Sequence, residues 1–93
     1  MIDEGVVLRK LIELFLNLNT ISKDLDKALG SYPEAISFQM DITIDLIALE
    51  QGLPINKEDD PTLPDYYDSI WECLNDPSED PDVIYDKIIK LGP

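Results

Sequence analysis

Histidine is absent from this 93-residue chain, cysteine occurs once, and glycine occurs four times. Without histidine the chain lacks the commonest general base and the commonest nitrogen ligand for metals. Within this chain, that excludes a Cys–His pair, a Ser–His–Asp triad and a zinc site. One cysteine forms no internal disulfide, which fits the reducing cytoplasm. So few glycines provide no phosphate-binding loop. We therefore expect no catalytic residue, no metal and no cofactor.

Long apolar runs are also missing. The longest apolar stretch, residues 6–18, is interrupted by Arg9, Lys10, Glu13 and Asn17, whereas a membrane-spanning helix needs roughly 18 apolar residues in succession. The N-terminus carries acids where a secretion signal carries positive charge. These features predict a soluble, cytoplasmic protein that does not enter a membrane.

Basic residues are scarce, and acids are abundant. The chain has 20 acids and 7 bases, a net charge of −13. Residues 1–31 hold five acids and four bases, a net −1, whereas residues 32–93 hold fifteen acids and three bases, a net −12. Nucleic acid and anionic membranes carry the same sign and are disfavoured as partners. Acidity can serve solubility alone, but the asymmetry favours an acidic face for a basic protein partner.

Apolar periodicity predicts an all-α fold, a compact bundle of four to five helices in a single domain spanning residues 1–93. The helical segments are expected at residues 3–18, 21–29, 31–51, 63–75 and 81–91. Asp3, Thr62 and Asp80 are candidate N-caps, the second of them in a capping box with Asp65. Cys73 is expected to be a small core residue.

The third of these segments has conflicting signals. Apolar and polar residues alternate from Ile36 to Leu46, and a period of two is typical of a strand. However, Ser31 and Glu34 fit a capping box, Gly52 provides a stop, and no other segment alternates to supply a pairing strand. We therefore predict a helix that is apolar on two faces and packed between neighbours.

Acidic residues recur at helical spacing in two of the predicted helices. On a helix that turns by about 100° per residue, the residues of each set share one side. The first set lies in segment 63–75 and at its end, with Trp71 on its flank, and the second lies in segment 31–51. The two sets are Asp65, Asp68, Glu72 and Asp76, and Glu34, Asp41 and Asp45. Such surfaces steer and hold cationic proteins; the simpler alternative is a solvated helix face with Trp71 filling the core.

Two shorter motifs have weaker implications. Glu58, Asp59 and Asp60 with Asp65 do not have the ligand spacing of a helix–loop–helix calcium site, so a solvated loop is expected there. The triplet at residues 68–70 is similar to the Asp-Ser-Leu of acyl carrier proteins. In that family a long helix follows the serine, whereas here residues 75–77 interrupt the helix soon afterwards.

One set of residues within the range 58–91 carries a family resemblance. It consists of Asp65-Tyr66-Tyr67, the acidic stretch Asp76-Pro77-Ser78-Glu79-Asp80, and a following helix with Ile84 and Ile88. This part of the chain resembles the helical immunity proteins of nuclease colicins, small acidic four-helix bundles that bind basic nuclease domains. The resemblance implies that the tyrosine pair and nearby acids meet a toxin. In this chain the tyrosines begin a longer helix, and their positions on a helical wheel place both side chains towards the core.

These observations together predict a non-catalytic inhibitor, an immunity protein of the colicin or contact-dependent-inhibition class that neutralises a basic bacterial nuclease toxin. The candidate partner-binding residues are Asp65, Tyr67, Asp68, Trp71, Glu72, Asp76, Glu34, Asp41 and Asp45. One alternative is a phage-encoded nucleic-acid mimic that inhibits a defence nuclease or a DNA-binding protein. Another is an acidic carrier or adaptor domain.

Overall fold

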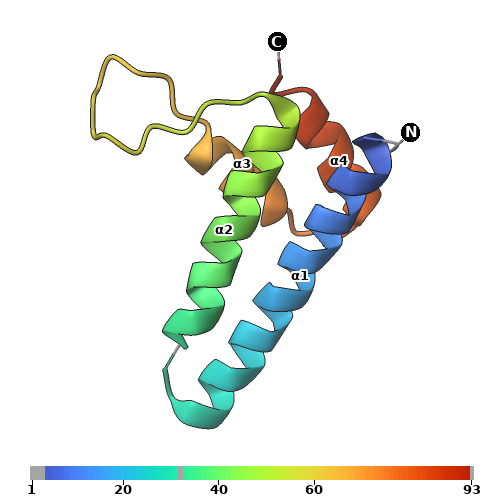
Figure 1. The fold of residues 1–93 in the computed structure, drawn as a ribbon. Coiled ribbons are helices and arrows are strands. Elements are labelled where there is room, and N and C mark those ends of the chain that lie inside the picture. The colour runs from blue at the N-terminus through green and yellow to red at the C-terminus, as the bar shows by residue number, and fades with distance from the viewer. Residues whose placement is uncertain (1–3, 32, 93) are drawn as a thin grey trace.

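The computed structural model describes residues 4–31 and 33–92 and shows an all-α fold. Its helices are α1 (Glu4–Leu29), α2 (Glu34–Gln51), α3 (Tyr67–Leu74) and α4 (Pro81–Ile89). The first two form a long antiparallel hairpin. The two short helices pack near the end where α1 begins and α2 ends, so the turn end of the hairpin projects (Figure 1). None of these helices combines the length and apolar character needed to cross a bilayer.

Helix α1 is continuous where the sequence predicted two helices, at 3–18 and 21–29, and that division was wrong. Residues 19 and 20 include no glycine or proline. The Thr20 hydroxyl donates to the Leu16 carbonyl at 3.1 Å, a bond that is compatible with a helix interior. Gly30 ends the helix with a φ of 76° and donates its N–H to the Asp26 carbonyl. Asp3, the expected cap, lies outside the described residues.

Helix α2 confirms the prediction that the alternating segment is helical. One face is buried and includes Met40, Ile44 and Ile47. The other apolar face is exposed, so the expectation that neighbours pack on both sides of this helix was wrong. Its capping box was also wrong, since Pro33 precedes the first turn without a side-chain cap. Gly52, with a φ of 67°, closes the helix as expected.

Helix α3 begins at Tyr67, four residues later than predicted. The predicted capping box of Thr62 with Asp65 is absent. Thr62 instead bonds to the Asp60 carboxylate, while Asp65 accepts from the Tyr67 N–H at 3.0 Å. Because Asp65 precedes α3 and Asp76 follows it, only Asp68 and Glu72 of the predicted acidic strip lie on this helix.

Helix α4 begins as predicted. Pro81 is its first residue, and the Asp80 carboxylate accepts from the Asp82 N–H at 2.9 Å. Arg9 of α1 forms an ion pair with Asp82 and lies 4.6 Å from the centre of the Tyr85 ring. These contacts attach α4 to the first half of α1.

All four helices and the loop after α2 contribute to one hydrophobic core. Its buried apolar members are Leu8, Ile12, Phe15, Leu18, Met40, Ile44, Ile47, Ala48, Leu53, Ile70, Leu74, Ile84 and Ile88. Cys73 packs against this core but is only partly buried, so its expected place inside the core is corrected to the margin. Burial raises the pKa of its thiol. Because Ile70 and Leu74 of α3 are buried in this core, the core determines the orientation of α3 relative to the hairpin.

Candidate functional site

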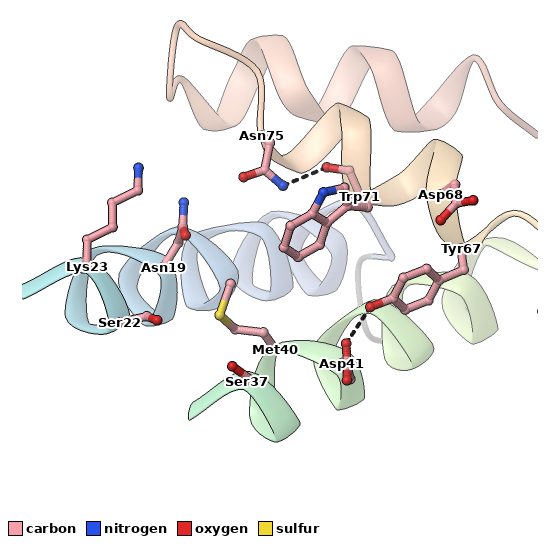
Figure 2. A pocket seen from close by; sticks show the side chains of 10 residues that line it. All are labelled: Asn19, Ser22, Lys23, Ser37, Met40, Asp41, Tyr67, Asp68, Trp71 and Asn75. Atoms are coloured by element: carbon pink, nitrogen blue, oxygen red, sulfur yellow. Dashed lines mark hydrogen bonds between the residues drawn. The ribbon is translucent and has the colours of Figure 1, made fainter. Parts of the chain in front are cut away.

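A cleft of about 550 Å³ lies between α1, α2 and α3 (Figure 2). It is lined by Asn19, Ser22 and Lys23 from α1, by Ser37, Met40 and Asp41 from α2, and by Tyr67, Asp68, Trp71 and Asn75 from α3 and its end. Its lining includes four of the predicted site residues. The α1 residues were not predicted, because only the hairpin packing brings their face of α1 opposite α3.

Trp71 is the largest side chain in the cleft. Its ring makes a T-shaped contact with Phe15 of the core, with the two centroids 5.7 Å apart and the planes at 87°. The residue is 39% exposed, and Figure 2 shows its ring pointing from α3 towards the side chains of α1 and α2. One side of the tryptophan is therefore fixed by the core while the remainder is free to contact a partner. Trp71 therefore packs against the core on one side, as the simpler alternative expected, and its contact with a partner stays a prediction.

Tyr67 connects α3 to α2. Its hydroxyl donates a hydrogen bond to the Asp41 carboxylate (Figure 2). Burial raises the pKa of Tyr67, and so do the hydrogen bond to Asp41 and the negative charges of Asp41, Asp45 and Asp68. The hydroxyl therefore stays protonated at neutral pH. Tyr67 is partly buried, in agreement with its predicted turn towards the core.

Four of the seven acids of the two predicted strips meet around this tyrosine. Asp41 and Asp68 lie beside Tyr67 in the cleft. On the other side, Tyr67 also lines a shallower hollow of about 320 Å³ with Asp41, Asp45 and Asp65. We call Asp41, Asp45, Asp65 and Asp68 the carboxylate ring. Lys57 partly neutralises it through an ion pair with Asp45 at 2.6 Å.

Three predicted site residues, all acids, lie apart from the carboxylate ring. Asp76 is turned inward. It pairs with Lys87 of α4, accepts hydrogen bonds from Ser78, and leaves only 10% of its side chain exposed. Glu34 is exposed in the first turn of α2, about 10 Å along the helix axis from Asp41. Glu72 is exposed on α3 beside Trp71 and outside the cleft lining.

The arrangement offers an aromatic ring, several carboxylates and a fixed hydroxyl, but no group of side chains placed to hold a metal among residues 4–31 and 33–92. Carboxylates attract lysine and arginine, and an exposed indole adds area and a cation–π contact. Lys23 stands on the α1 side of the cleft without an ion pair to the described residues. A cationic group is therefore best accommodated on the α2–α3 side.

The pair of Asp76 and Lys87 predicts a pH dependence of stability. Hydrogen bonds from Lys87 and Ser78 lower the pKa of Asp76 from 3.8 to about 2. Because the folded pKa lies below the unfolded one, this stabilisation is present above about pH 4 and is lost as the pH falls towards 2. We expect wild type and Asp76→Asn to differ in free energy of unfolding at pH 6 and to converge near pH 2. Urea titrations followed by circular dichroism measure this; a constant difference would contradict it.

Comparison with known proteins gives no relative from which a function can be transferred. No family model matches the chain, and neither a curated protein nor a solved structure matches it. The features of the molecule that indicate a function are therefore the carboxylate ring and Trp71.

Proposed function

We propose that this protein is a non-catalytic cytoplasmic inhibitor that binds a basic protein through the carboxylate ring and Trp71, and that it serves as an immunity protein against a bacterial nuclease toxin. The observation that carries the proposal is the convergence of Asp41, Asp45, Asp65 and Asp68 around Tyr67, next to a half-exposed tryptophan. Acids from separate parts of the chain meet at one place, as a binding surface requires.

The carboxylate ring and Trp71 are suited to bind the substrate-binding surface of a nuclease. Such a surface is lined by lysine and arginine side chains that neutralise phosphates. Carboxylates take the place of those phosphates, and the net charge of −13 steers the basic partner towards this protein. Trp71 supplies apolar contact area at the centre, where interface residues contribute most to affinity. Tyr67 holds Asp41 in position and so reduces the ordering cost of binding.

The alternatives differ in how far the geometry supports them. A phage-encoded nucleic-acid mimic would use the same carboxylates, and it differs from an immunity protein only in its target. A carrier domain needs an accessible attachment serine followed by a long helix. Ser69 is partly buried, and α3 ends five residues after it at Leu74. No observation favours the carrier alternative.

The experiment that tests the proposal is inhibition of a nuclease. Basic nuclease domains encoded in the same genome are purified and assayed on plasmid DNA and on RNA with increasing amounts of this protein. For one of them, activity should fall in proportion to the added protein and reach its minimum at about one equivalent, because immunity-type binding is tight and stoichiometric.

A polyglutamate chain of matched charge is the control. Acidity alone would make polyglutamate inhibit as well as the protein does. That outcome, or the absence of stoichiometric inhibition with every nuclease domain assayed, would contradict the proposed function. Inhibition of a nuclease from a cell's defence against phage, with none of the toxin nucleases inhibited, would select the nucleic-acid mimic.

A further inference from the structure

Helix α2 has an apolar stripe that no other described part of the chain covers. It consists of Phe38, Ile42, Leu46 and Leu49, which are 65%, 40%, 43% and 78% exposed. At about 100° per residue these four lie within a sector of about 80°. The stripe is the second of the two apolar faces behind the alternation in this segment, and its length follows most of the helix.

Helix α1 adds to this apolar surface. Leu14 and Ile21 are 44% and 46% exposed and lie two turns apart on one side of the helix. Ile21 lies eight residues before the end of α1, and Ile42 lies eight residues after the start of α2. Because the helices are antiparallel, the two residues lie at the same height along the hairpin. The same relation holds for Leu14 and Leu49.

The apolar side chains of both helices lie on the face of the hairpin that points away from α3. On each helix they are roughly 140° around the axis from the residues that line the cleft. We call the six side chains Leu14, Ile21, Phe38, Ile42, Leu46 and Leu49 the hairpin face. Figure 1 shows the two hairpin helices running antiparallel beside each other, so the apolar side chains of both helices follow one direction.

The hairpin face is as large as the largest apolar patches on monomeric proteins, which often bind a partner. Fully exposed large apolar residues present roughly 150–200 Å² each, so the six together leave roughly 500 Å² in contact with solvent. The largest apolar patches on monomeric proteins reach about 300–600 Å². A stable dimer buries about 800 Å² on each partner, so the hairpin face would supply the larger part of such an interface.

The charge of the two helices identifies the occupant. Helix α1 carries four acids and four bases, whereas α2 carries four acids and no base. A basic partner is directed by charge to the carboxylate ring, which shares no residue with the hairpin face. A second copy can pack on this face with a two-fold axis parallel to the helices. In that arrangement α1 of each copy, which has no net charge, faces the acidic α2 of the other copy, and the two acidic helices do not face each other.

We propose that the hairpin face is covered by a second copy of this chain, so that two hairpins form an antiparallel four-helix bundle with the six side chains of each copy in its centre. The interface is isologous, because the same residues are contributed by both copies. Both clefts and both carboxylate rings remain on the outside. Dimerisation is independent of the proposed function, and each copy keeps its own site for a basic partner.

Sedimentation equilibrium tests the proposal with the full chain. At about 100 µM and moderate salt the wild type should have twice the 10.5 kDa mass of one chain and should dissociate on dilution. Ile42→Glu places a charge in the apolar interface of each copy and should raise the dimer dissociation constant at least about tenfold. Ile89→Glu is the matched control, since Ile89 is 45% exposed on α4 and lies outside the hairpin face.

Salt gives an independent readout. Two copies of net charge −13 repel each other, and screening weakens that repulsion, so the dimer should become tighter as salt rises. Leu49→Glu, at the most exposed position of the face, repeats the test if Ile42→Glu lowers the helical circular dichroism signal. A monomer at all concentrations and salts would overturn the dimer. Equal weakening by Ile42→Glu and Ile89→Glu would overturn the hairpin face as its interface. Neither result changes the inhibition of a nuclease, so failure of the two proposals is distinguishable.

Discussion

Replacing Phe15 with alanine is expected to lower the free energy of unfolding by about 3–5 kcal/mol. Phe15 is fully buried at the middle of α1, and its ring makes a T-shaped contact with the Trp71 ring. The substitution removes the buried apolar ring and leaves a cavity. The surrounding helices relax only partly into that cavity. Proteins of this size have a total stability of roughly 5–15 kcal/mol, so the variant loses a large share of it.

Phe38→Ala is the matched control for this experiment. The chain has two phenylalanines, and Phe38 is 65% exposed, so the same substitution there should change the stability of the monomer by less than about 1 kcal/mol. Urea titrations are followed by circular dichroism, because Trp71 is the only tryptophan and its fluorescence responds to Phe15 directly. Protein is kept dilute, since dimerisation adds to apparent stability. Similar losses from both variants would show that Phe15 is not at the centre of the core.

The sequence was most informative where a local rule acts alone. Asp80 and Pro81 begin α4 as predicted, because a cap and a first-turn proline need only the residues beside them. Helix α2 was recognised despite its alternation, since a long segment without a pairing strand cannot form a sheet. In contrast, the break predicted near residue 19 failed, because polar residues inside a helix do not end it when their side chains find local acceptors.

The candidate site could be predicted only in part for a different reason. Periodicity places acids on one side of a helix, but it does not show which side of which helix meets another. The pairing of Asp76 with Lys87 joins the end of α3 to α4, and the bond from Tyr67 to Asp41 joins α3 to α2. Both depend on the packing angle of α3, which Ile70 and Leu74 determine from inside the core. The types of residue in the site could therefore be predicted from the sequence. Which of these residues lie together depends on how the helices pack.

The same limit explains why the hairpin face was not foreseen. Apolar residues on two sides of the segment 31–51 imply burial on both sides, and only the packed structure shows that α1 and α3 cover just one of them. An amphipathic pattern predicts that a helix face is buried. It does not predict whether the same chain or another molecule buries that face. The exposure of the second face is the observation on which the proposed dimer rests.

Removing two carboxylates beside Trp71 should weaken binding of the nuclease partner at least about 30-fold, or about 2 kcal/mol. The variant is Asp68→Ala with Glu72→Ala. Both acids are exposed on α3, Asp68 within the cleft and Glu72 beside Trp71. Charges that face a cationic partner at a desolvated centre contribute far more to affinity than charges at the margin. Because exposed carboxylates stabilise the fold by less than about 1 kcal/mol each, folding should be nearly unchanged.

The matched control is Asp24→Ala with Asp86→Ala. These acids are exposed on α1 and α4, form no ion pair with the described residues, and lie outside the cleft lining and the carboxylate ring. Each double variant removes two negative charges, so long-range attraction falls equally and the difference in affinity reports position alone. Calorimetry with the inhibited nuclease measures it. Equal losses from both variants would mean that total charge, and not the surface beside Trp71, holds the partner.

The salt dependence separates this interaction from dimerisation. Association with a basic partner should slow as salt rises, because the steering field reaches only about 8–10 Å at physiological ionic strength. The dimer of the hairpin face should strengthen over the same range, since there the screened charges are alike. Stopped-flow association and sedimentation on the same samples follow the two effects together. If partner association were insensitive to salt, the electrostatic mechanism would fail, and the net charge of −13 would have to be explained without the partner.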